Sequence, residues 1–193
     1  MASEADSKTG LAAVAEAARQ APTSGDGGRG LPPVHLWNPA HCGDIDIVIR
    51  RDGVWMHEGS PIGRAELVRL FSTVLRKDPE GYCLVTPVEK LSIRVEDLPF
   101  RAIAVDIGDA TLTFTTDVGD VVEAGADHPI EVETDPTTGE PAPRLHVRAD
   151  LWARIARPVF YELVERAGVE DGRLTVRSNG TAFALGPRGA GVG

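Results

Sequence analysis

Short segments in which alternate residues are apolar, each followed by a turn sequence, constrain the fold of this chain more than any other feature. In residues 44–50, Ile45, Ile47 and Ile49 share one face of a predicted strand. Asp52-Gly53 follows as a hairpin turn, because glycine accepts the positive φ that such turns require. Strand patterns recur at residues 82–87, 90–97 and 100–107, so we predict a chain rich in antiparallel sheet.

Two segments have helical spacing instead. Residues 61–77 place apolar side chains on one helix face, with Ser60 as the capping residue and Pro61 in the first turn. Residues 148–168 have the same spacing, and Pro158 within them predicts a kink or a break. Hairpins are predicted on both sides of this second helix, at residues 129–147 and at residues 172–186, where Asn179-Gly180 is the turn.

Each half thus follows the order hairpin, helix, hairpin, and "RAEL" at 64–67 has a counterpart in "RADL" at 148–151. We therefore predict an α+β fold of two similar halves, each a ββαββ-like repeat with mainly antiparallel sheet. The predicted domains are 31–107 and 108–193. Residues 1–30 are predicted to form a flexible N-terminal tail, because "PTSGDGGRG" has the composition of a linker. The alternative for this segment is a small partner-binding helix.

The composition limits the partners and the location. A formal net charge of -9 argues against nucleic acid and against an anionic membrane surface as partners. No apolar run reaches the length of about 20 residues that a membrane span needs, and the first residues lack the features of a secretory signal. The two cysteines, Cys42 and Cys83, are too few for a disulfide framework. We expect a cytoplasmic protein whose partner is a small molecule or another protein.

Acidic and basic residues separate in the second half. No lysine or arginine occurs from residue 102 to residue 143, and arginines recur from Arg144 onward. An acidic binding face is one explanation of this pattern. The simpler interpretation, which we favour, is that Glu131 and Glu133 project into solvent and that some of these acids face the returning arginines.

No motif in the sequence is specific enough to name a reaction. His41, Cys42 and Asp44 are close together, but the paired spacing of zinc ligands is missing, so we predict no metal site. The stretch "GSPIG" at 59–63 is out of register with a nucleophile elbow, and no phosphate-binding glycine loop occurs. We therefore assign no catalytic residue and no cofactor.

A turn in the first half is the best candidate for a ligand site. Thr86, Glu89 and Lys90 place a hydroxyl, a carboxylate and an ammonium around Pro87. Arg64 is predicted near a helix start, where its charge opposes the helix dipole, so we expect it to pair with Glu89 or with a ligand anion. A turn fixed by an ordinary salt bridge is the alternative. The candidate ligand-binding residues are Trp37, Trp55, His57, Glu58, Arg64, Thr86, Glu89 and Lys90.

Four stretches carry a resemblance to a known family: "LPPVHLWNPAHCGDIDIVIRRDG", "GSPIGRAELVRLFSTVLRKD", "YCLVTPVEKLSIRVEDLPF" and "ARPVFYELVE". Together they resemble the bacterial domain-of-unknown-function family numbered twelve-eighty-five, over residues 31–186. The resemblance implies a mixed α and β architecture of two similar halves with repeated motifs. It also implies a role in signal transduction, and it supplies no catalytic residues to carry over.

Two functions are compatible with the sequence. The first, which we favour, is a non-catalytic module that binds a small ligand or a protein, because catalytic signatures are missing and the junction of two similar halves forms a natural cleft. The second is a small hydrolase or transferase that uses Arg64, Thr86, Glu89 and Lys90. Geometry separates the two, since an enzyme needs these side chains to converge on one enclosed site.

Overall fold

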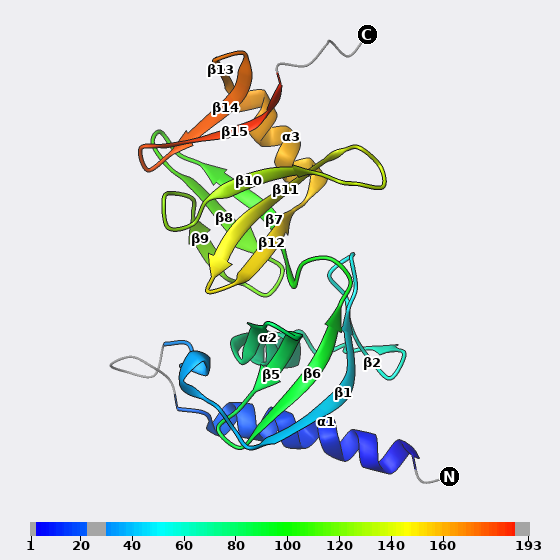
Figure 1. The fold of residues 1–193 in the computed structure, drawn as a ribbon. Helices are drawn as coiled ribbons and strands as arrows, with labels where there is room; N and C mark the ends of the chain where they lie inside the picture. Colours follow the sequence, from blue (N-terminus) through cyan, green and yellow to red (C-terminus); the bar gives the residue numbers. More distant parts are fainter. Residues whose placement is uncertain (1–2, 23–29, 188–193) are drawn as a thin grey trace. The chain divides into compact units, whose positions relative to one another are not determined.

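The chain divides into two units in the computed structural model, which describes residues 3–22 and 30–187 (Figure 1). Unit 1 ends at Asp97 and unit 2 begins at Leu98. The predicted boundary after residue 107 is wrong, because strand β7 (Phe100–Ile107) pairs with two strands of unit 2. The predicted linker at residues 22–30 lies outside the described residues, except for its two ends.

Unit 1 is built on a six-stranded sheet with the order β3-β2-β1-β6-β5-β4. The central strands β1 (His41–Ile49) and β6 (Glu89–Val95) are parallel, and the other neighbouring strands pair in antiparallel fashion. The remaining elements of unit 1 are α1 (Ser3–Gln20), η1 (Val34–Leu36), β2 (Trp55–His57), β3 (Ser60–Pro61), α2 (Ala65–Thr73), β4 (Leu75–Asp78) and β5 (Gly81–Val85).

Helix α2 is shorter than the sequence predicts. Pro61 belongs to β3, where it pairs with Met56, and Arg64 instead of Ser60 is the residue that precedes the helix. At the other end, residues 75–78 pair with β5, so strand β4 replaces the last helical turn of the prediction. Leu75 is buried in this strand, and its apolar spacing fits a helix equally well, which explains the error.

The core of unit 1 lies against one face of this sheet. Figure 1 shows helix α2 on that face. Side chains alternate along β1, so every second residue points into the core and the residues between them point to the opposite face. The largest side chains of this core, all at most 2% exposed, are Ile47, Ile49, Trp55 and Phe71.

Helix α1 belongs to this unit and lies against α2. Val14, Ala15 and Ala18 are buried along one side of α1, whereas Ala13 is exposed. The prediction of a flexible tail is therefore wrong for the part of α1 that carries these buried residues. Alanine side chains form most of the buried stripe, and their small apolar area makes a docked helix hard to recognise from sequence alone.

Unit 2 repeats the strand order of unit 1. Its six-stranded sheet has the order β10-β11-β12-β7-β8-β9, so again two three-stranded meanders are joined by one parallel pair, here β7 with β12 (Leu151–Ile155). Helix α3 (Arg157–Arg166) and a separate sheet β13-β14-β15 follow. The remaining strands are β8 (Leu112–Thr116), β9 (Val121–Glu123), β10 (Ile130–Thr134), β11 (Pro141–Arg148), β13 (Gly168–Glu170), β14 (Arg173–Ser178) and β15 (Thr181–Pro187).

The predicted fold class is confirmed: the chain is α+β, with two similar halves and mainly antiparallel sheet. The predicted hairpin at residues 172–186 is also confirmed, since β14 and β15 pair around Asn179 and Gly180, whose φ angles are 49° and 75°. The hairpin at residues 129–147 forms from β10 and β11. Turn residues with a strong preference for positive φ thus located these hairpins correctly.

Residues 148–168 form a strand and a helix instead of one helix. Strand β12 pairs with β11 and β7, and α3 begins only at Arg157. Pro158 lies in the first turn of α3, where its missing N–H leaves no hydrogen bond unmade. The predicted break is therefore found just before Pro158, and the alternative of a kink is wrong. "RADL" lies at the turn between β11 and β12, whereas "RAEL" starts α2, and these two positions are not equivalent in the repeat.

The docking of α1 gives a first prediction. We expect Val14→Asp to lower the free energy of unfolding by about 2 kcal/mol or more, because it buries an unpaired carboxylate. Ala13→Asp is the matched control on the exposed side of the same helix, and its cost should stay below about 1 kcal/mol. Urea unfolding followed by tryptophan fluorescence measures both. Equal effects of the two variants would show that α1 is not docked through Val14.

Candidate functional site

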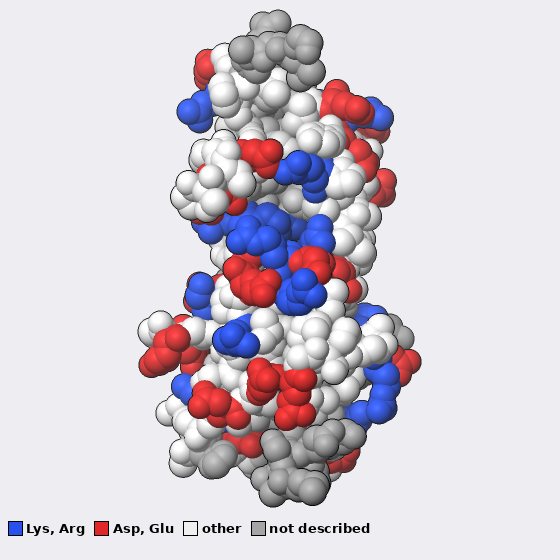
Figure 2. Space-filling model, turned by 90° about the vertical axis from the view of Figure 1, so that its right-hand side faces the viewer, with Lys and Arg blue, Asp and Glu red and all other residues white. Residues whose placement is uncertain are grey.

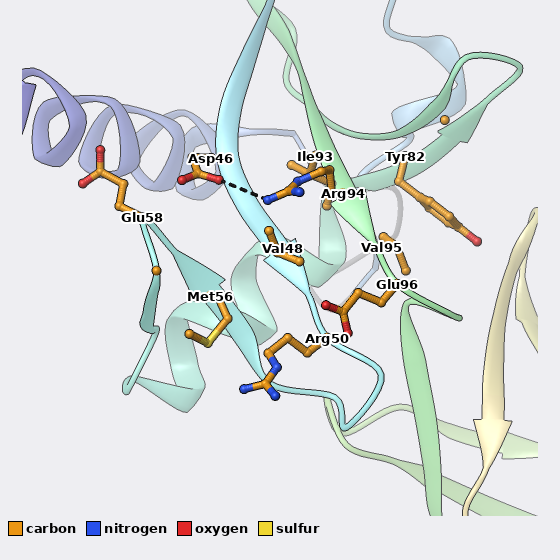
Figure 3. A pocket seen from close by; sticks show the side chains of 12 residues that line it. Asp46, Val48, Arg50, Met56, Glu58, Tyr82, Ile93, Arg94, Val95 and Glu96 are labelled. Atoms are coloured by element: carbon orange, nitrogen blue, oxygen red, sulfur yellow. Dashed lines mark ion pairs between the residues drawn. The ribbon is translucent and has the colours of Figure 1, made fainter.

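An open groove lies on the face of the unit 1 sheet opposite the core (Figure 3). Its volume is about 670 Å³, and residues of β1, β2, β5 and β6 line it together with the turns next to them. The alternation along β1 explains the position, because Ile47 and Ile49 point into the core while Asp46, Val48 and Arg50 point into the groove.

The groove combines an apolar floor with a charged rim. Val48, Met56 and Tyr82 supply apolar side chains to the lining, and Asp46, Arg50, Glu58, Arg94 and Glu96 supply charged ones. Ile93, which belongs to the buried core, and Val95, which pairs with Ile49, border the groove. Asp46 and Arg94 lie 3.8 Å apart, and their side chains are 59% and 77% exposed. Such an exposed ion pair contributes little stability, so both groups remain available to a ligand at small cost.

Glu58 reaches this rim from a tight turn between β2 and β3. His57 and Ser60 pair in the register of these strands, so Glu58 and Gly59 are the two turn residues. Their φ angles are 48° and 75°, a conformation that glycine adopts freely and glutamate rarely does. The turn therefore holds the Glu58 carboxylate beside the groove at some conformational cost.

His57 does not share the groove with Glu58. It lines a second, smaller pocket of about 380 Å³, which we call the α1–α2 pocket. This pocket is formed by one residue of α1, by strand β3 and its neighbours, and by the start of α2. Its lining consists of Leu11, His57, Ser60, Pro61, Ile62, Gly63, Arg64 and Leu67. His57 and Glu58, although adjacent in sequence, therefore line two different pockets.

The remaining predicted ligand residues do not converge on one site. Trp55 is a core residue, buried to 2% exposure. Thr86 is also buried, and its Oγ1 accepts the N–H of Glu89 at 3.2 Å, so it fixes the turn. Among the described residues, no hydrogen bond or ion pair joins Arg64, Glu89 and Lys90, and Arg64 lines the α1–α2 pocket instead.

The sequence analysis missed a charge cluster around Asp78. The guanidinium of Arg76 donates to both carboxylate oxygens of Asp78, at 2.6 and 2.8 Å, and Lys90 Nζ lies 3.2 Å from Oδ2. Arg76 also donates to the carbonyl oxygens of Val34 and Trp37, at 2.8 and 2.7 Å. The cluster therefore ties η1 to the sheet. The predicted helix over residues 61–77 concealed it, because Arg76 and Asp78 face one another only on a strand.

This cluster shifts two pKa values. Hydrogen bonding to Arg76, followed by the contact with Lys90, lowers the pKa of Asp78 to about 2. Burial, reinforced by the negative charge of Asp78, raises the pKa of the Cys83 thiol to about 11. Cys83 therefore stays protonated at neutral pH, and Asp78 stays ionised down to strongly acidic pH.

Opposite charges also pair in unit 2. Arg144 contacts Glu131 at 2.6 Å and Glu133 at 2.9 Å, and its guanidinium stacks over the Trp152 ring. This confirms that some residues of the acidic stretch face the returning arginines. Figure 2 shows Lys and Arg side chains beside Asp and Glu side chains on the visible face.

No three His, Cys, Asp or Glu side chains among the described residues gather in an arrangement that could hold a metal ion. No described helix combines the length and the apolar character that crossing a bilayer requires.

The Asp78 cluster gives a prediction with a pH dependence. The pKa of the Asp78 carboxyl group is about 2 in the folded state, compared with an ordinary value of 3.8. The ionised carboxylate therefore stabilises the folded state fully above pH 4, and this stabilisation is lost as the pH falls toward 2. We expect Asp78→Asn to lower the free energy of unfolding by about 2 kcal/mol at pH 7 and by less at pH 2. Asp44→Asn, at an exposed site on β1, should have little effect. A variant as stable as the wild type at pH 7 would contradict the role of Asp78.

The cysteines give a chemical prediction. Cys83 is buried and protonated, whereas Cys42 is exposed. Iodoacetamide reacts with accessible thiolates, so we expect the folded protein to be alkylated at Cys42 and protected at Cys83. Mass spectrometry of proteolytic peptides after brief treatment at pH 7.5 measures both sites. Equal labelling of the two thiols in the folded protein, with the unfolded protein as the control, would contradict the buried position of Cys83.

Comparisons with known proteins place the chain in a family. Residues 32–98 match the model described as "Domain of unknown function (DUF1285), N-terminal domain", and residues 99–185 match "Protein of unknown function (DUF1285), C-terminal domain". The boundary between the two models lies one residue beyond the boundary between units 1 and 2. No curated protein matches the chain.

Two crystal structures are similar. A DUF1285 family protein from Silicibacter pomeroyi DSS-3 has 46% sequence identity and a TM-score of 0.81, over 91% of this chain and 95% of that chain. A DUF1285 family protein from Shewanella baltica OS155 has 23% identity and a TM-score of 0.51, over 63% of this chain and 92% of that chain. The second likeness shows the fold alone.

Proposed function

We propose that this chain, which belongs to the DUF1285 family, is a non-catalytic module that binds a small molecule or a protein segment in the groove of unit 1. The observation that carries the proposal is the combination of an apolar floor with a rim of both charge signs. The proposal includes a cytoplasmic location, which we expect from the composition, and a role in signal transduction, which the family resemblance implies.

The floor supports binding through the hydrophobic effect. Val48 and Met56 are half-buried, and a ligand that covers them removes further apolar area from water, at about 25 cal/mol per Å². The shape is that of a shallow site on a rigid sheet, which needs little rearrangement to accept a partner. A sheet also fixes the spacing of the floor residues, because each strand is held by hydrogen bonds to its neighbours.

The rim supports orientation of the ligand. Arg50 and Arg94 offer positive charge, and Asp46, Glu58 and Glu96 offer negative charge, all around the same floor (Figure 3). A ligand with an apolar centre and charged groups of both signs complements this arrangement. Charges placed in this way favour one orientation and reject ligands with the wrong charge pattern.

The alternative function, a small hydrolase or transferase around Arg64, Thr86, Glu89 and Lys90, has less support. Thr86 is engaged in its own turn, Lys90 pairs with Asp78, and Arg64 lines a different pocket. Catalysis by these groups requires a common reacting atom within hydrogen-bonding reach of each. The geometry offers them no such point.

A thermal-shift screen of metabolites and nucleotides tests the proposal. A ligand present at about 100 times its Kd stabilises the folded state by about 2.7 kcal/mol, which raises the Tm by several degrees. We expect Val48→Asp and Arg94→Glu to abolish the shift, because they alter the floor and the rim. Arg69→Glu, an exposed position on α2 outside the groove, is the matched control.

The outcomes separate the versions of the proposal. A Tm shift that persists in both groove variants would contradict it. If no small molecule shifts the Tm, selection of displayed peptides on the wild-type protein tests the protein-segment version. Peptides that bind the wild type and Arg94→Glu equally well would then contradict it.

A further inference from the structure

The α1–α2 pocket is lined by solvent-accessible polar side chains that have no hydrogen-bond partner among the described residues. Arg64, His57 and Ser60 line it, and their side chains form no hydrogen bond or ion pair with any described residue. Two of these three groups, the guanidinium and the hydroxyl, donate hydrogen bonds at every physiological pH, and the imidazole offers a third polar contact. The pocket therefore presents donors without an acceptor.

The position of Arg64 favours an anion as its partner. Arg64 directly precedes α2, and no side chain caps the first turn of that helix. A positive charge at this end opposes the helix dipole, so the sequence analysis expected either Glu89 or a ligand anion as its partner. No hydrogen bond or ion pair between described residues joins Arg64 to Glu89, so a ligand anion is the partner that we consider.

The rest of the pocket is apolar. Leu11 of α1 faces the same space as Leu67 of α2, and Pro61 and Ile62 complete the lining. A volume of about 380 Å³ accommodates a molecule with a short hydrocarbon chain. The pocket therefore has hydrogen-bond donors in one part and apolar side chains in the rest. This arrangement complements an anion that carries a hydrocarbon group.

We propose that the α1–α2 pocket binds an organic anion in which a carboxylate or a phosphate monoester is joined to a short apolar chain. Arg64 pairs with the anionic group of the ligand, and Ser60 and His57 complete the hydrogen bonds of that group. The apolar part of the ligand packs between Leu11 and Leu67. This site is separate from the groove, because His57 and Glu58 direct their side chains into different pockets. It does not depend on the proposed function.

Titration of the full chain with three probes tests the proposal. The probes are hexanoate, butyl phosphate and hexan-1-ol. Isothermal titration calorimetry or amide chemical shifts measure their binding. We expect at least one anion to bind with a Kd on the order of 1 mM, and the alcohol to bind about tenfold more weakly. Binding of hexanoate alone identifies a carboxylate ligand, and binding of butyl phosphate alone identifies a phosphate ester.

Matched variants locate the binding. Arg64→Gln removes the charge and leaves a shorter, uncharged amide donor, so we expect the anion to bind about fivefold more weakly or worse. Arg69→Gln, an exposed position of α2 outside the pocket, should leave the affinity unchanged. Both sites are exposed, so neither substitution should prevent folding.

Three results would overturn the proposal: hexan-1-ol binding as tightly as the anions, an affinity unchanged in Arg64→Gln, or no binding of either anion at a concentration on the order of 10 mM. The groove variant Arg94→Glu should bind the anion like the wild type. A loss of anion binding in Arg94→Glu alone would assign the anion to the groove and contradict a site at α1 and α2.

Discussion

The parallel pairing of β1 with β6 is the interaction on which the rest of unit 1 depends. These strands are far apart in sequence, and their pairing joins two antiparallel meanders into one sheet. Parallel neighbours require a connection that leaves the sheet and returns, and this connection contains α2. The helix then covers one face of the sheet, so the opposite face is left for the groove. Unit 2 has the same central pair in β7 and β12, without a helix between its two meanders.

The period of two along a strand connects this topology to function. Because successive side chains point to opposite faces, β1, β2, β5 and β6 each contribute to the core and to the groove. Met56 of β2 and Glu58 of the following turn line the groove, whereas His57 lines the α1–α2 pocket. A single short segment, β2 with the turn that follows it, therefore supplies both candidate sites while remaining part of the scaffold.

Sequence patterns predicted the strands better than the helices, for a physical reason. Residues 100–107 alternate and end in turn residues, and they form β7 with the predicted bounds. Leu75 and Leu151 have apolar spacing that suits a helix and a strand equally, and pairing with β5 and with β7 decided between them. The groove could not be predicted as a set, because its residues run from Asp46 to Glu96 and meet only through the register of four strands. Glu58 was among the candidate residues, but nothing in the sequence separated it from His57 as the one that lines the groove.

The central claim is that ligands bind on the open face of the unit 1 sheet. Amide chemical-shift mapping tests this most directly, with isotopically labelled full-length chain and a compound that stabilises it. We expect the largest changes at Val48, Met56, Tyr82 and Arg94, which come from β1, β2, β5 and β6 and meet in the groove. Changes confined to unit 2, or to residues of unit 1 outside the groove, would contradict the account.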